Sequence, residues 1–203
     1  MKQRATKLWP ATRARFVTSA HRLSERPRWK LLEIAIAGRS NAGKSSLINA
    51  LLGVGKLAVT SKTPGRTRAL NFFALNEYLA LVDLPGYGYA ALSKEGAQSL
   101  SRLLYEYLRT EQNLIGVLLV VDARRDPESQ EFELAALLRE RGLSLILALN
   151  KCDKLAHHER AAALKKYAAL ADDPILCSAL QKEGIAELRR RVDELVRSAH
   201  KSA

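Results

Sequence analysis

Cysteine is scarce in this chain of 203 residues, which contains only two, Cys152 and Cys177. Two cysteines that lie apart in the sequence make neither a metal-binding cluster nor the disulfide framework of a small secreted protein. We therefore expect both thiols to be reduced and the protein to be cytoplasmic.

Long apolar runs are also lacking. The apolar run at 115–121 is far shorter than the roughly 18 residues that a membrane helix needs, so it is predicted to be a buried strand and we expect no stable membrane association. No continuous apolar core follows the N-terminal charges, which argues against a secretory signal. A mitochondrial transit peptide is an alternative for the arginine-rich start, although Pro10 would interrupt its amphipathic helix.

Acidic residues are scarce at the N-terminus. Residues 1–30 contain nine Lys and Arg against one acid, Glu25, and so carry +8 of the net charge of +12. This balance favours a polyanionic partner, most often nucleic acid. We expect residues 1–28 to be a basic N-terminal arm and residues 29–203 to be a single domain, which acts as a monomer. Scattered apolar residues of the arm could dock on that domain, namely Leu8, Trp9, Phe16, Val17 and Leu23.

From Leu31 onward, segments with strand and helix patterns alternate, which predicts an α/β fold of three layers. The predicted sheet is mostly parallel, has helices on both faces and contains six strands, at 32–37, 69–74, 78–82, 115–121, 143–149 and 174–177. The predicted helices are at 44–52, 94–109, 128–141, 157–171 and 185–199. Only residues 75–77 join the second and third strands, and this hairpin length makes one strand antiparallel. Residues 53–68 show no clear period and are predicted to be a functional loop.

A phosphate-binding loop is the clearest motif in the chain. The pattern GxxxxGKS, which is met by Gly38, Gly43, Lys44 and Ser45, lies between a predicted strand and a predicted helix. Its glycines let backbone N–H groups face phosphate oxygens, and the helix adds its positive end. Lys44 can then reach the β- and γ-phosphates, and the Ser45 hydroxyl can hold Mg²⁺. The candidate residues of this loop are Gly38, Arg39, Ser40, Asn41, Ala42, Gly43, Lys44, Ser45 and Ser46.

A second motif, DxxG, follows the third predicted strand as Asp83-Leu84-Pro85-Gly86. It lies at the carboxyl end of a strand, where open α/β sheets bind ligands. Asp83 can bind Mg²⁺ through a water, and the Gly86 N–H can bond the γ-phosphate, so this loop would respond to the presence of that phosphate. The alternative is an ordinary turn at the end of a strand.

A third motif, NKxD, follows the fifth predicted strand as Asn150-Lys151-Cys152-Asp153. The Asp153 carboxylate can accept hydrogen bonds from the N1–H and the 2-amino group of guanine, a donor pair that adenine lacks. Asn150 would tie this loop to the phosphate-binding loop, and the stem of Lys151 can lie over the base. An ATPase with a chance NKCD is the alternative.

The sixth predicted strand ends in Cys177-Ser178-Ala179, where a backbone N–H, that of Ala179 by preference, can bond guanine O6. A threonine from the long loop would complete the Mg²⁺ ligands. Thr60, Thr63 and Thr67 are all placed to do so, and the chemistry of the residues does not choose among them.

Taken together, these motifs resemble those of the EngB family of bacterial GTPases, within the Era and TrmE group. The resemblance runs from about Phe16 to Val196, and GRSN and DLPGYGYA are specific to this family. Many relatives carry Thr where this chain has Asn150, a departure that leaves guanine recognition intact. The matching strings are GRSNAGKSSLINALLG (38–53), TSKTPGRTRALNFF (60–73), LVDLPGYGYA (81–90), VVDARRDP (120–127), LNKCDKL (149–155) and CSALQKEGIAELR (177–189).

The resemblance implies GTP and GDP as ligands and selects Thr67, in the run Gly65-Arg66-Thr67, as the second Mg²⁺ ligand. The matching asparagine in TrmE-group loops helps to hold K⁺, so Asn41 could do the same, although it could equally brace the loop by hydrogen bonds. Hydrolysis would proceed by in-line attack of water, with Lys44, Thr67 and Gly86 stabilising the transferred phosphoryl group.

Tyr87 occupies the position that holds a water-positioning glutamine in Ras-like enzymes, and a phenol cannot supply that amide's paired donor and acceptor. Slow, partner-stimulated hydrolysis is therefore expected. The family also implies a role in assembly of the large ribosomal subunit, with its rRNA and proteins as partners, and a link to cell division and septation. A septum-associated or regulatory GTPase that does not bind ribosomes is the alternative.

Overall fold

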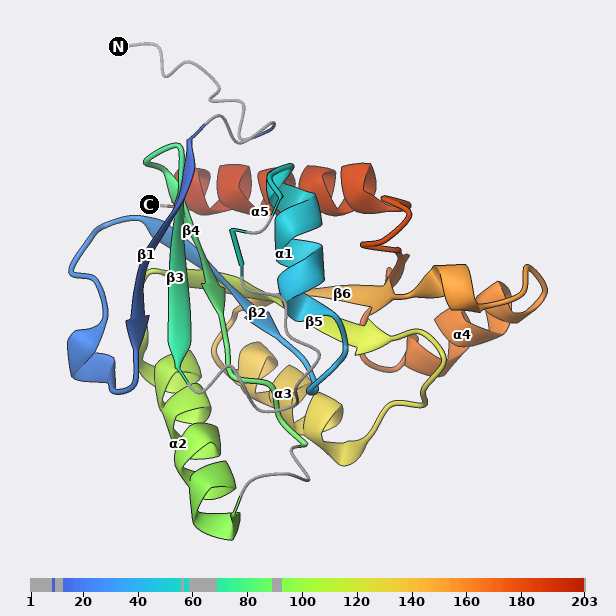
Figure 1. The fold of residues 1–203 in the computed structure, drawn as a ribbon, viewed down its shortest axis with the longest axis horizontal. Helices are drawn as coiled ribbons and strands as arrows, with labels where there is room; N and C mark the ends of the chain where they lie inside the picture. The colour runs from blue at the N-terminus through green and yellow to red at the C-terminus, as the bar shows by residue number, and fades with distance from the viewer. Residues whose placement is uncertain (1–8, 10–12, 56, 59–68, 89–92, 203) are drawn as a thin grey trace.

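Seven strands form one sheet at the centre of the protein, with helices on both of its faces (Figure 1). The structure, a computed structural model, describes residue 9 and residues 13–55, 57–58, 69–88 and 93–202. The strands are β1 (Ala14–Ala20), β2 (Leu32–Ala37), β3 (Leu70–Leu75), β4 (Leu79–Asp83), β5 (Leu114–Asp122), β6 (Ser144–Asn150) and β7 (Ile175–Leu176). The helices are α1 (Lys44–Leu52), α2 (Lys94–Thr110), α3 (Ser129–Glu140), α4 (Glu159–Tyr167) and α5 (Ile185–Ser202), with short 3-10 helices η1 (Leu23–Glu25) and η2 (Cys152–Lys154).

The sheet is mostly parallel and has the strand order β1-β3-β4-β2-β5-β6-β7. Strand β2 runs parallel to β4 and β5, and β6 runs parallel to β5 and β7. Strand β3 is antiparallel to both of its neighbours, β1 and β4. The predicted α/β class and the predicted β3–β4 hairpin are confirmed.

Strand β1 corrects the strand count, because the sequence pattern predicts six strands. Among the described strands it pairs with β3 alone and forms one edge of the sheet, with a bulge between Phe16 and Thr18. Most of its side chains are exposed or half-buried, so its pattern does not read as a buried strand. It lies inside the segment expected to be an arm. Residues 14–20 of that segment are therefore part of the sheet.

Trp9, further toward the N-terminus, also packs on the domain. Its ring is buried with 7% exposed, and its Nε1 donates a 3.2 Å hydrogen bond to the carbonyl of Arg189 on α5. The guanidinium of Arg189 lies 5.2 Å from the centre of the Trp9 ring, within the range of a cation–π contact. Trp9 is thus docked as expected. Val17 and Leu23 also pack against the buried core, and the Phe16 ring packs edge-on against Phe73.

Two apolar layers cover the sheet, one on each face. Helices α1 and α5 cover one face, and α2, α3 and α4 lie on the other (Figure 1). Strand β2 is buried on both faces because it lies inside the sheet, which explains its nearly continuous apolar sequence. Within the described ranges, no helix combines the length and the apolar character that crossing a membrane requires.

Parallel pairing brings the ends of four strands to one edge of the sheet. Gly38 follows β2, Asp83 ends β4, Asp122 ends β5 and Asn150 ends β6. The register pairs Asp122 with Asn150 directly. This edge is where open α/β sheets bind ligands, and the motifs found in the sequence meet there.

Candidate functional site

The loop between β2 and α1 needs glycine at two positions. At Gly38, which has φ +146°, a Cβ atom would lie 2.1 Å from the Val120 carbonyl oxygen. At Gly43, which has φ +95° and caps α1, a Cβ atom would lie 2.4 Å from Asn150 Nδ2. Only glycine allows such close approach to β5 and β6, so the backbone turns tightly before α1 begins at Lys44. The first N–H groups of α1 are thereby aimed at the edge of the sheet.

Lys44 is buried under this loop. Its Nζ donates to the carbonyls of Gly38, at 2.9 Å, and Arg39, at 3.3 Å. Burial lowers the pKa of Lys44, and the nearby Asp83 carboxylate opposes that shift. Gly86 lies close by, since a Cβ atom there would be 2.8 Å from Lys44 Nζ. The glycine of the DxxG motif thus lies directly against the lysine of the loop.

Asp83 is a buried carboxylate at the end of β4, with 2% of its surface exposed. Burial raises its pKa to about 6, although Lys44 and hydrogen bonds from Ser45 and Asn71 act in the opposite direction. Its Oδ1 has no hydrogen-bond partner in the part of the chain that the structure describes. A buried oxygen of this kind, beside the Ser45 hydroxyl, suits a metal-bound water. The neighbouring Leu84 donates its N–H to the Ile36 carbonyl and so fixes the start of the loop.

Asn150 joins three loops at the other side of the site. Its Nδ2 donates to the Ala42 carbonyl at 2.9 Å. This is the predicted tie to the phosphate-binding loop of residues 38–46, which we call the glycine loop. Its Oδ1 accepts from the Ala179 N–H at 3.1 Å, so this N–H, which the sequence assigns to guanine O6, is bonded within the protein. The Cys152 N–H donates to the Cys177 carbonyl at 3.0 Å. The two predicted base-binding loops therefore lie side by side.

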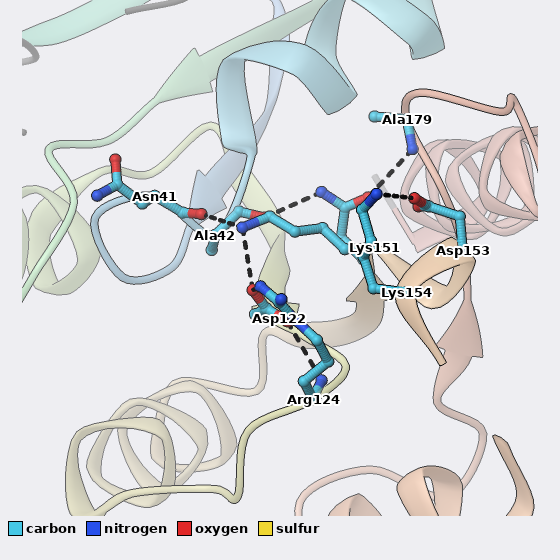
Figure 2. Close-up of polar contacts among 9 residues, drawn as sticks. Asn41, Ala42, Asp122, Arg124, Lys151, Asp153, Lys154 and Ala179 are labelled. Carbon is cyan, nitrogen blue, oxygen red and sulfur yellow. Dashed lines mark hydrogen bonds and ion pairs between the residues drawn. The ribbon is translucent and has the colours of Figure 1, made fainter. Parts of the chain in front are cut away.

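The Asp153 carboxylate lies where these two predicted base-binding loops meet (Figure 2). Its Oδ1 accepts a 2.6 Å hydrogen bond from the Ser178 hydroxyl, which lowers its pKa and keeps it ionised near neutral pH. A carboxylate fixed in this way can accept a pair of donors from a ligand with its remaining lone pairs.

Lys151 spans from the NKxD loop to the glycine loop, as Figure 2 shows. Its Nζ donates to the Asn41 carbonyl at 2.6 Å and to Asp122 Oδ2 at 3.0 Å. The sequence predicts only that the stem of Lys151 lies over the base. The sequence does not predict the contact with Asp122, although this carboxylate stands in VVDARRDP, one of the strings that carry the resemblance to the EngB family.

The side chain and the backbone of Tyr87 are both held by other parts of the protein. Its hydroxyl donates a 2.9 Å hydrogen bond to Glu131 Oε1 on α3, and its carbonyl accepts from the Ser40 N–H at 2.9 Å. Burial raises the pKa of Tyr87, and Glu131 raises it further. Arg39 bonds Glu128 at the start of α3. The loop after Gly86 is thus tied to both the glycine loop and α3.

The other predicted site residues divide into two groups. Ser46 is exposed in the first turn of α1, and Pro85 is buried between Leu84 and Gly86. Gly65, Arg66 and Thr67, together with Thr60 and Thr63, lie outside the described residues.

Three motifs meet at one edge of this sheet: the glycine loop between β2 and α1, DxxG after β4 and NKxD after β6. Together they define the protein as a P-loop GTPase. A family described as "50S ribosome-binding GTPase" matches residues 33–151. The chain therefore belongs to this class.

Similarity to individual proteins assigns the chain to a narrower family within this class. The chain is 41% identical over 194 residues to the "Probable GTP-binding protein EngB" of Geobacter metallireducens, covering 94% of this chain and 95% of the relative. It is 45% identical over 152 residues to the protein of the same name from Pelotomaculum thermopropionicum, covering 75% and 77%. A crystal structure of a probable GTP-binding protein engB aligns with TM-score 0.67 and 28% identity, over 82% of this chain and 99% of that one. The chain belongs to the EngB family of GTPases.

Proposed function

We propose that the protein binds GTP and GDP at this edge of the sheet and reads guanine through Asp153. The observation that carries this proposal is the joining of three loops by Asn150 and Lys151, because it holds the guanine-reading carboxylate at a fixed place beside the glycine loop. Lys151 covers one face of the base with its stem. The backbone N–H groups of the glycine loop, together with Lys44, hold the phosphates.

The metal ions belong to the same proposal. Ser45 and Thr67 would hold Mg²⁺, with Asp83 acting through a water. The Oδ1 of Asp83, which has no hydrogen-bond partner among the described residues, supports this choice. The bound ion would offset negative charge on the β- and γ-phosphates. Asn41 would help to hold K⁺ near those phosphates. Because Tyr87 is bonded to Glu131, slow intrinsic hydrolysis that a partner accelerates is the expected behaviour.

The partner we propose is the large ribosomal subunit or its precursor, with normal cell division depending on that role. Two observations support it. The matching family is described as ribosome-binding, and residues 1–30 carry +8, which gives a salt-sensitive attraction to rRNA phosphates. Binding in the GTP state is expected to be stronger, because the loop that contains Thr67 would close on the metal only with the γ-phosphate present.

Sedimentation with purified large subunits across a salt series tests the proposal, with GDP and a non-hydrolysable GTP analogue compared. Deleting the whole arm would remove β1 and Trp9, which pack on the domain. The better variant replaces Lys2, Arg4 and Lys7 of the arm by Gln. Its matched control makes the same replacement at three exposed cations of the domain, Arg102, Arg109 and Lys165.

The arm variant should bind more weakly and with a flatter salt dependence, at an unchanged ratio between the GTP and GDP states. The control should retain the salt dependence of the natural sequence. Equal binding with GDP and with the GTP analogue would contradict the proposed dependence of ribosome binding on nucleotide state. An unaltered salt dependence in the arm variant would contradict the proposed contribution of the arm to binding. Filaments without ribosome binding would favour the septum-associated alternative.

A further inference from the structure

Lys151 has a long side chain, whose aliphatic stem can cover a base only if the side chain is held in one position. Its backbone has φ 66°, in the left-handed region, and its side chain is 31% exposed. Packing alone does not immobilise such a chain, because an ammonium on a flexible stem has several rotamers of similar energy. Its position is therefore set by the acceptors of its Nζ, the Asn41 carbonyl and the Asp122 carboxylate.

Asp122 is itself fixed on all sides. Its side chain is 8% exposed, and the register of β5 on β6 places it opposite Asn150, next to Lys151. Arg124 donates to Oδ1 from its backbone N at 3.2 Å and from Nε at 2.9 Å, and to Oδ2 from a terminal nitrogen at 2.7 Å. A guanidinium bonded to both oxygens fixes the plane of the carboxylate. Oδ2 is consequently aimed at Lys151 (Figure 2).

The electrostatics agree with this geometry. Burial would raise the pKa of Asp122, but hydrogen bonds from Arg124 and Lys151 outweigh it and hold that pKa well below its ordinary value. The carboxylate is thus ionised at any pH at which the protein would be assayed. Two cations share one carboxylate here, and Arg124 is the more exposed of them, with 51% of its side chain accessible.

We propose that Asp122, oriented by Arg124, is a positioning residue that fixes Lys151 over the base and so sets nucleotide affinity without reading the identity of the base. This inference rests on the proposed role of Lys151. It separates two tasks at the site. Asp153 discriminates among bases through its carboxylate, whereas Asp122 acts on any purine that lies under the stem of Lys151.

Asp122→Asn keeps the shape of the side chain but removes its charge, and the affinity for GDP should fall about tenfold. The affinity for inosine diphosphate should fall by the same factor, because the stem packs over either purine. Arg124→Gln should weaken GDP binding by about threefold, since it only loosens the carboxylate. The matched control is Arg125→Gln, an exposed neighbour whose guanidinium contacts Glu128 at 3.8 Å, and it should leave affinity unchanged.

A double-mutant cycle with Lys151→Met decides whether Asp122 acts through Lys151. In the Lys151→Met background, Asp122→Asn should change GDP affinity less than about twofold. A loss in that background as large as in the natural sequence would show a general structural role, and an altered ratio between GDP and inosine diphosphate would show base reading. Either result, or an unchanged affinity for Asp122→Asn alone, overturns the inference. If Lys151→Met binds GDP normally, the proposed role of Lys151 itself fails.

Discussion

The Tyr87 hydroxyl bonds Glu131 Oε1 at 2.9 Å and thereby links the DxxG loop to the first turn of α3. The other carboxylate oxygen of Glu131 accepts from the Glu128 N–H at 2.7 Å, so the carboxylate has a partner on each oxygen. Glu131 is almost fully buried, with 2% exposed. A phenol held in this way is a structural tie, and it is not available to orient an attacking water.

Tyr87→Phe therefore separates structure from catalysis. Losing the donor to a buried carboxylate should lower the free energy of unfolding by about 1–2 kcal/mol. Intrinsic GTP hydrolysis at saturating nucleotide should remain within about twofold of the natural sequence, because no water-positioning group is removed. Chemical denaturation and single-turnover hydrolysis measure the two effects. A tenfold loss of hydrolysis with unchanged stability would instead make Tyr87 catalytic.

The two thiols should react slowly in the folded protein. Burial raises the pKa of Cys152 to about 11, with Glu183 adding to the shift, and burial raises that of Cys177 to about 12. Because the thiolate is the reactive form, alkylation should keep accelerating through pH 9–10, where a free thiol of ordinary pKa has reached its plateau. Bound GDP should slow labelling further, since both cysteines lie in the loops that would enclose the base.

Single-cysteine variants, Cys152→Ser and Cys177→Ser, assign the rates to each site. Identical rates with and without GDP would mean that the thiols are only packing residues that the ligand does not protect. A labelling rate that levels off near pH 9 would contradict the raised pKa values.

Asn41 provides a prediction about monovalent ions. It lies in the glycine loop with φ 65°, its side chain is exposed, and its carbonyl is bonded to Lys151. If its side-chain oxygen helps to hold K⁺, GTP hydrolysis should be at least about fivefold faster in K⁺ than in Na⁺ at equal ionic strength, through added positive charge near the phosphates. Asn41→Ala should remove that difference. Equal rates in both salts, for the isolated protein and with ribosomal subunits, would leave the residue a loop brace.

The elements that position the site could be predicted almost to the residue. Strand β2 and helix α1 have the predicted bounds, because a fully buried strand is apolar throughout and glycines flank the helix at 43 and 53. The tie from Asn150 to the glycine loop followed from the chemistry of the motif. These features depend on local sequence and on the direction of the strands.

Other features depend on contacts between distant segments and were missed. Strand β1 is half exposed and is paired on one side only, so its sequence lacks the period of a buried strand. Asp122 and Lys151 lie 29 residues apart, and only the register of β5 on β6 brings them together. In the sequence, Glu131 is one of several acidic residues of a predicted helix, and nothing in the local pattern predicts its contact with Tyr87.

Guanine recognition by Asp153 is tested most directly by measuring the affinities of GDP and xanthosine diphosphate for the natural sequence and for Asp153→Asn. An amide reverses one donor–acceptor relation at the base, so GDP should bind about 100-fold more weakly to the variant, and xanthosine diphosphate should become the preferred ligand. Asp126→Asn changes an exposed aspartate within the segment that joins β5 to α3, and this control variant should bind GDP normally. If Asp153→Asn keeps both the affinity for GDP and the preference for it, Asp153 does not read the base.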